Sequence, residues 1–126
     1  MSLRETVKLD NRVASAYCRG VPMSPKKFIL LKINKKLRHQ PVLRACEIIS
    51  FSLSPKKVRI LLRLFKAAIA AAKQKGEKVQ NLYVKSLTIG KCVVMKRVIY
   101  RARGRVDILS KRHSNLLLEL SRREVV

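Results

Sequence analysis

The amino-acid sequence predicts an α+β protein in which three helices pack on a small three-stranded antiparallel sheet, with a long β-hairpin protruding from it. Apolar residues recur at helical spacing over 25–75, and after Gly76 they alternate as in strands. A strongly basic stretch, Val93–Arg112, lies between two predicted strands. The length of 126 residues fits one domain. We therefore assign residues 1–12 to an N-terminal extension and 13–126 to a single domain.

The first predicted elements are a strand and a helix. The strand, Val13–Arg19, completes the sheet. Ser24 is a suitable N-cap, and Pro25 suits the first helical position, where its missing N–H costs nothing. A helix is therefore expected from Pro25 to about Leu37. Its apolar side chains are Ile29, Ile33 and Leu37, with Phe28 and Leu31 beside them.

Two further helices follow. Pro41 begins a short one that reaches about Ile49, and the longest runs from Pro55 to about Lys75. Ser54 is the predicted N-cap of the long helix, and Gly76 its left-handed C-cap. The core face of the long helix comprises Val58, Leu61, Leu62, Phe65, Ile69 and Ala72, and the other face carries Arg59, Arg63, Lys66 and Lys73. One face is thus expected to pack while the other presents cations.

The remaining two strands show period-two alternation. Within the first, the apolar residues change phase near Lys85-Ser86, which indicates a β-bulge or a twist. Leu82 and Val84 precede this point, and Leu87 and Ile89 follow it. In the last strand the alternating residues are Leu116, Leu118 and Leu120.

A hairpin over about 90–114 is predicted to join these strands, with Gly104 as the obvious turn residue. It carries one acid, Asp107, against Lys96, Arg97, Arg101, Arg103, Arg105, Lys111 and Arg112. Because a bare two-stranded ribbon is marginally stable in water, the same stretch could instead be a disordered basic loop. In either form its charge points to phosphates as the partner.

Charge is the most informative property of the whole chain. Lys and Arg number 30 against 7 Asp and Glu, a net charge of +23. A compact body with this charge would repel itself unless an anionic partner neutralised it, and nucleic acid is the leading candidate. A membrane surface is less suitable, because basic residues occur in nearly every stretch rather than on one face. No apolar run approaches the length of a membrane span.

Catalysis and metal binding find no support in the residue pattern. The acids are scattered, and the four glycines form no phosphate-cradling loop. His39 and His113 lie far in sequence from Cys18, Cys46 and Cys92, which lack any C-x-x-C pairing. The cysteines are interpreted as buried free thiols. We predict no enzyme, no cofactor and no metal.

The hairpin residues resemble a known signature. Met95-Lys96-Arg97, then Arg101-Ala102-Arg103-Gly104-Arg105, then Lys111-Arg112 and Ser114 are similar to the hairpin of bacterial-type large-subunit ribosomal protein twenty-two. The resemblance also covers the Ser24–Lys27 helix start, the Pro41–Ile49 helix and Ala67-Ala68-Ile69-Ala70 of the long helix. It spans about Tyr17 to Leu120, in the order of the family.

The resemblance implies a structural role in the ribosome. It implies binding to large-subunit ribosomal RNA, support of early subunit assembly, and a hairpin tip that lines the nascent-peptide exit tunnel. The RNA-binding residues it implies, together with basic residues of the body, are Arg19, Lys26, Lys27, Arg59, Arg63, Lys96, Arg97, Arg101, Arg103, Arg105, Lys111, Arg112 and His113. The implied tunnel tip is Ile99, Tyr100, Arg101, Ala102, Arg103, Gly104 and Arg105. Expected partners are this RNA, neighbouring large-subunit proteins and the nascent peptide, with no membrane and no homo-oligomer.

Several positions depart from the family pattern. Tyr100 stands where the tip often has Pro, and Asn115 where a His commonly follows the Ser. Gly90-Lys91-Cys92-Val93 replaces an acidic Gly-Pro segment, and the Gly that usually ends the first helix is missing around Asn34–Arg38. These departures leave open whether the ribosome belongs to a bacterial cytoplasm or to an organelle, a plastid or a mitochondrion.

Two other functional classes remain alternatives at this point. The repeated Ser-Pro-Lys-Lys at 24–27 and 54–57 would suit an architectural DNA-binding protein. The basic amphipathic helix Pro55–Lys75 would suit membrane disruption or calmodulin binding. Both features also have a structural explanation, as helix starts and as the core face of a helix.

Overall fold

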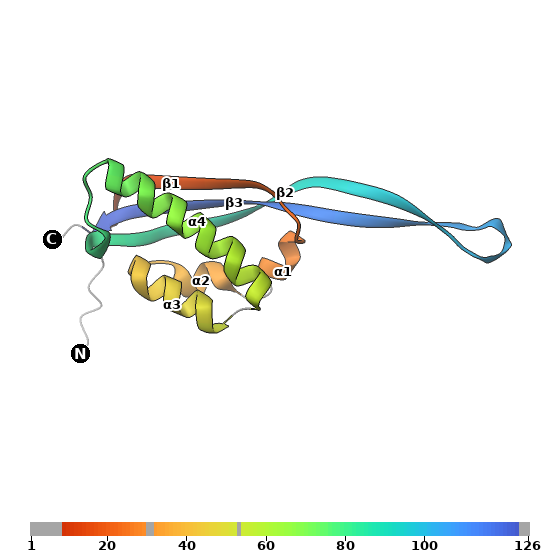
Figure 1. Cartoon of the computed structure of the whole chain (residues 1–126), viewed down its shortest axis with the longest axis horizontal. Helices are drawn as coiled ribbons and strands as arrows, with labels where there is room; N and C mark the ends of the chain where they lie inside the picture. The colour runs from red at the N-terminus through yellow and green to blue at the C-terminus, as the bar shows by residue number, and fades with distance from the viewer. Residues whose placement is uncertain (1–8, 30–31, 53, 124–126) are drawn as a thin grey trace.

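Three strands and four α-helices make up the part of the chain that the structure, a computed structural model, describes: residues 9–29, 32–52 and 54–123 (Figure 1). The strands are β1 (Leu9–Val21), β2 (Leu82–Tyr100) and β3 (Val106–Arg123). The helices are α1 (Pro25–Ile29), α2 (Ile33–Leu37), α3 (Val42–Ser52) and α4 (Pro55–Gln74), and the 3-10 turns are η1 (Val79–Asn81) and η2 (Ala102–Gly104). The predicted α+β class is confirmed.

The sheet is antiparallel in the order β1-β3-β2, so β3 is its central strand. Leu118 of β3 lies between Ala16 of β1 and Leu87 of β2. Because directly paired residues share one face of a sheet, these positions form one apolar face, which the helices cover. Leu116, Leu118 and Leu120 are fully buried on it, as their alternation predicted.

The predicted bulge in β2 is present at Lys85. Val84 pairs with Leu120, whereas Ser86 pairs with Glu119, so Lys85 is an extra residue in the ladder. The insertion returns Leu87 to the core face. On the opposite face, the Ser86 hydroxyl donates to Glu119 Oε2 at 2.9 Å.

The helix α4 ends in a Schellman motif, as the glycine predicted. Gly76 adopts φ +82°, and its N–H donates to the carbonyl of Lys73 at 2.9 Å. The N–H of Glu77 donates to the carbonyl of Ala72 at 3.2 Å, which completes the pair of bonds that satisfies the last helical carbonyls. Leu61, Phe65 and Ala72 are buried as predicted, and Leu64 and Ala68 are buried as well. The predicted core residues Val58, Leu62 and Ile69 are only partly buried and pack at the margin of the core.

The single first helix predicted over Pro25–Leu37 is wrong. The chain forms α1 and α2 instead, and Lys32 between them has a left-handed backbone, φ 50° and ψ 30°, which a continuous right-handed helix cannot contain. The break rotates the two halves relative to each other. Ile29 is therefore 57% exposed, whereas Phe28, Ile33 and Leu37 are buried. Leu31 lies outside the described residues.

The ends of β1 and α3 also differ from prediction. β1 begins at Leu9, four residues before the expected Val13, and α3 extends to Ser52. The segment between α2 and α3 pairs with the edge of β2. The N–H of His39 donates to the carbonyl of Val84, and the N–H of Val84 donates to the carbonyl of Gln40. This pairing covers part of an edge that would otherwise be open.

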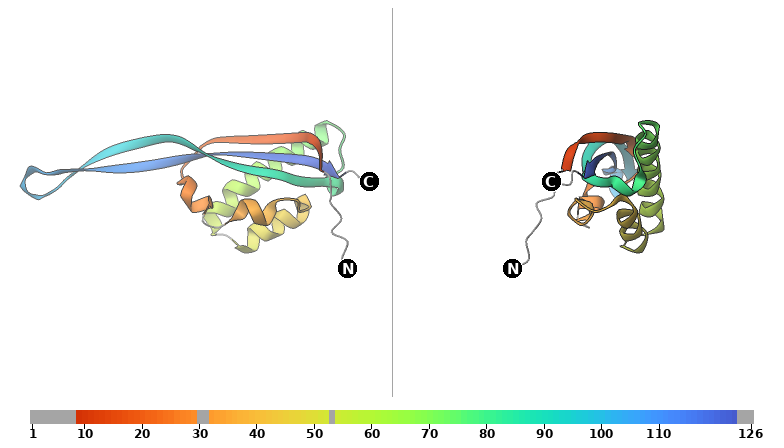
Figure 2. Two further views of the ribbon diagram at one scale, coloured as in Figure 1. Left: turned by 180° about the vertical axis from the view of Figure 1, so that it is seen from behind. Right: turned by 90° about the vertical axis from the view of Figure 1, so that its left-hand side faces the viewer.

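The predicted protruding hairpin is confirmed. β2 and β3 remain paired beyond the body, from Val94 opposite Arg112 to Tyr100 opposite Val106. Figures 1 and 2 show this ribbon extending away from all four helices, on the side opposite η1. Only its base approaches a helix of the described chain, where Val94, Lys96 and Arg112 line a pocket together with residues of α1.

Candidate nucleic-acid interface

The tip of the hairpin is a tight turn built by two left-handed residues. Arg103 has φ 61° and Gly104 φ 71°, and the N–H of Arg101 donates to the carbonyl of Arg105 at 2.8 Å. Arg101 Nε also binds Asp107 Oδ2 at 2.8 Å, with both side chains largely exposed. Arg103 and Arg105 are exposed and have no carboxylate partner in the described chain. The tip thus presents two unneutralised guanidinium groups.

The two faces of the hairpin carry different side chains. Near the tip, one face is apolar, and its four residues are at least half exposed: Val98, Tyr100, Val106 and Ile108. Closer to the body the same face carries Lys96 and Arg112. The other face mixes apolar and charged residues, which are Met95, Arg97, Ile99, Asp107, Leu109 and Lys111. Exposed apolar side chains gathered on one face mark a contact surface.

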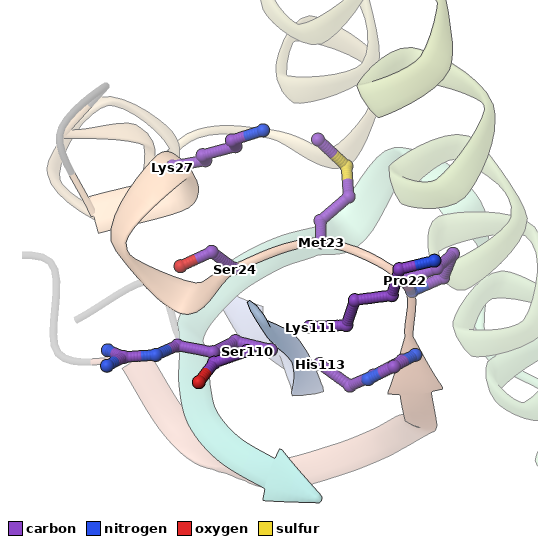
Figure 3. Close-up of a pocket in the computed structure, with 8 residues that line it drawn as sticks. Pro22, Met23, Ser24, Lys27, Ser110, Lys111 and His113 are labelled. Atoms are coloured by element: carbon purple, nitrogen blue, oxygen red, sulfur yellow. The ribbon is translucent and has the colours of Figure 1, made fainter. Parts of the chain in front are cut away.

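Where the hairpin leaves the body, its base faces α1 across an open cleft. Figure 3 shows Ser24 and Lys27 on one side and Ser110, Lys111 and His113 of β3 on the other. A second part of the cleft is lined by Lys26 together with Lys96 and Arg112 of the hairpin. The structure therefore brings together six predicted RNA-binding residues: Lys26, Lys27, Lys96, Lys111, Arg112 and His113.

A second, smaller group of predicted residues lies on the body. Arg19 of β1 and Arg63 of α4 line one groove, whose walls include Ile60, Leu64 and Ala67. Arg59 is exposed on α4 but does not line this groove. The basic body residues thus divide between this groove and the cleft at the hairpin base.

The structure adds residues that sequence reasoning missed. Lys91 lines the cleft beside Lys26, although the sequence marked it only within a departure from the family pattern. Asn115 Oδ1 accepts from the N–H of Gly20 at 3.2 Å, and its Nδ2 donates to the carbonyl of Lys91 at 3.4 Å. Asn115 therefore joins β1 and β2 where the three-stranded sheet narrows to the hairpin. The sequence signal for this role is a polar amide side chain at a position flanked by strand residues.

Three further features of the described residues concern metal binding, membrane spanning and the cysteines. No group of three or more His, Cys, Asp or Glu residues there could hold a metal ion. None of the described helices is long and apolar enough to cross a membrane. Cys18, Cys46 and Cys92 are free thiols as predicted, but each is only partly buried. Cys18 and Cys46 lie at the margin of the packed core, and Cys92 lines the cleft at the hairpin base.

A small α+β body with a net charge of +23 and a projecting cationic ribbon is typical of the class of nucleic-acid-binding proteins. Comparison with known families narrows this class. The model of the family described as ribosomal protein L22p/L17e matches residues 16–121. The chain therefore belongs to this ribosomal protein family, a family of structural proteins and not of enzymes.

Individual relatives agree with this assignment. The chain is 34% identical over 112 residues to the large ribosomal subunit protein uL22 of Wolbachia sp. subsp. Drosophila simulans (strain wRi), covering 86% of this chain and 91% of the relative. It is 30% identical over 120 residues to the uL22 protein of Rickettsia prowazekii (strain Madrid E), covering 94% and 98%. With the uL22 protein of Thermotoga sp. (strain RQ2), identity is 38% over 105 residues, covering 82% and 64%. These relatives are bacterial, and the ribosome is the location that the family implies.

Proposed function

We propose that the chain binds large-subunit ribosomal RNA, supports early assembly of the large subunit, and lines the nascent-peptide exit tunnel with the tip of its hairpin. The observation that carries this proposal is the ribbon itself. It exposes both cations and large apolar side chains over its whole length beyond the body. Such a ribbon is marginal in water alone, so a surrounding partner has to supply the missing contacts.

Contacts to phosphates supply most of the affinity in the proposed RNA binding. The arm residues Lys96, Arg97, Lys111 and Arg112 are exposed and have no carboxylate partner in the described chain. Arg19 and Arg63 offer a second contact through their groove, and exposed Arg59 a third. Because these cations lie on separate elements, one chain can bind several RNA segments at once. The rigid fold would then hold those segments in fixed relative positions, which is how a structural protein supports assembly.

The proposed tunnel contact rests on the geometry of the tip. Ile99–Arg105 is the part of the described chain farthest from the body (Figure 1). Asp107 partly neutralises Arg101, whereas Arg103 and Arg105 are free to meet phosphate or a passing peptide. Tyr100 is 83% exposed and offers a flat ring beside them. The apolar residues Val98 and Ile108 behind the tip suit contact with bases or with a neighbouring large-subunit protein.

Sedimentation of a tagged chain tests the ribosomal proposal. Lysate is run on sucrose gradients at moderate and then high salt, and the tagged chain is followed through the fractions. We expect co-migration with large subunits that survives the salt wash, because many phosphate contacts act together. Release into the light fractions, or association with DNA, would overturn the proposal.

A second experiment tests whether the tip contacts the nascent peptide while the body supports assembly. We expect Arg103→Ala to leave the amount of assembled large subunit unchanged while altering crosslinks between the tip and a stalled nascent peptide. Arg63→Ala is the matched body variant, and it should leave those crosslinks unchanged. Loss of assembly in Arg103→Ala with an intact crosslinking pattern would refute this division.

A further inference from the structure

The cleft between α1 and the hairpin base has a composition that phosphate binding alone does not explain. Its two parts share Ser24, Ser110, Arg112 and His113, so they form one continuous depression. The larger part holds about 700 Å³, within the range of small-ligand sites. None of its described lining residues is acidic, and its rim carries Lys26, Lys27, Lys91, Lys96, Lys111 and Arg112. The rim therefore suits an anion.

Apolar side chains line the cleft beside its cations. Ile29 of α1 and Val94 of β2 line the larger part and are 57% and 43% exposed. Pro22 and Met23 line the other part, together with His113. Ile29 thus offers an apolar side chain to the cleft that is not packed in the core. A ligand that fills the cleft has to offer an apolar face as well as a negative charge.

His113 supplies a third feature. It lines both parts of the cleft and is partly exposed. The imidazole ring is also flat, so it can stack on a base or bind a base edge, depending on its orientation.

From these three features we infer that the cleft receives one unstacked nucleotide of RNA, with its base against Ile29, Val94 and His113 and its phosphates on the cationic rim. This inference rests on the proposed RNA-binding function and makes it more specific. A regular duplex keeps its bases stacked and would offer the cleft only phosphates. It would leave Ile29 and Val94 uncovered. The cleft should therefore select a loop, bulge or junction.

The two histidines of the chain allow a direct test by proton NMR. His113 lines the cleft, whereas His39 is exposed between α2 and α3 and lines neither part of it, so His39 is an internal reference. The full chain is titrated at constant pH with hexa-adenylate, with hexa-uridylate, with a blunt RNA duplex of equal charge, and with inorganic phosphate. We expect a saturable shift of the His113 ring signals with at least one single strand, and little shift of His39.

Substitution of an exposed wall residue tests the apolar contact without a cost to the core. Ile29→Ser should weaken single-strand binding at least about fivefold, because a hydroxyl replaces the apolar surface that would contact the base, and should leave duplex binding unchanged. Leu43→Ser is the matched control, since Leu43 is 56% exposed on α3 and does not line the cleft. It should leave both affinities unchanged.

The outcomes distinguish failure of the nucleotide site from failure of the proposed RNA-binding function. If both RNA forms bind but His113 does not respond, or if duplex or phosphate shifts it equally, the nucleotide site is refuted and the proposed function stands. Equal losses of single-strand affinity in Ile29→Ser and Leu43→Ser would refute it too. If neither RNA form binds the chain, the inference and the proposed function fail together.

Discussion

Arg97 tests how the hairpin arms hold RNA. It lies on β2 opposite Leu109, is exposed, and has no carboxylate partner in the described chain. Arg97→Gln should remove one phosphate contact while keeping a polar, unbranched side chain. The slope of log affinity against log salt should then become less negative by about 0.7 for single-stranded or 0.9 for duplex RNA.

This change in slope gives a measurable ratio of affinities. Between about 50 and 200 mM salt the concentration rises fourfold, so a slope change of about 0.7–0.9 alters affinity by roughly 2.6- to 3.5-fold. The affinity deficit of Arg97→Gln relative to the unmodified chain should therefore shrink by that ratio over this range. If Arg97 made only a hydrogen bond to an uncharged group of the RNA, the affinity deficit of Arg97→Gln would not change with salt.

The assay is fluorescence anisotropy with a labelled fragment of large-subunit ribosomal RNA at several salt concentrations. Arg97→Lys keeps the charge and should keep the slope. Arg44→Gln removes an exposed arginine from α3, outside the predicted interface, and should also keep it. The reasoning is refuted if Arg97→Gln retains the full slope, or if Arg97→Lys loses as much as Arg97→Gln.

Three other substitutions or measurements test separate parts of the structure. Asp107→Asn should raise RNA affinity at low salt, since it frees Arg101, yet change the unfolding free energy by less than about 1 kcal/mol because the pair is exposed; a lower affinity would contradict this. Phe65→Ala should destabilise the chain by about 3–5 kcal/mol in urea unfolding, because the ring is fully buried; a loss below about 1 kcal/mol would contradict the core assignment. Burial, and then the Glu47 carboxylate, raise the pKa of the Cys46 thiol above its ordinary value. At about pH 8 a smaller fraction of Cys46 is thiolate, so iodoacetamide should modify it more slowly than an ordinary exposed thiol. The modification rate should still rise in more alkaline buffer. Peptide mass spectrometry measures this rate, and a rate that levels off near pH 8 would contradict the prediction.

Features set by neighbouring residues could be predicted from the sequence. The ends of α4 follow from Pro55 at its start and Gly76 after its last turn, and both lie where they were expected. The change of phase near Lys85 predicted a bulge or a twist, and the register shows one extra residue there. The α+β class and the protruding hairpin follow from periodicity and charge in the same way.

Features set by distant contacts could not be predicted. No Gly or Pro marks the break at Lys32, whose left-handed backbone is held by packing that buries Phe28 on one side and Ile33 on the other. The added burial of Leu64 and Ala68 on α4 likewise depends on which elements approach the helix. A hydrophobic pattern gives the direction of a core face, but the neighbouring elements decide its width.

The same division holds for the candidate interface. The sequence by itself determined that the chain is an extremely basic α+β protein, and which cations belong to its hairpin. Only the tertiary structure decided that Lys26 and Lys27 face Arg112 and His113 across one cleft, and that Ile29 opens into it. Charge and periodicity are local properties that a short window of sequence contains. The cleft depends on strand order, on the register of β2 against β3 and on the break before α2, which arise from packing between residues far apart in the chain.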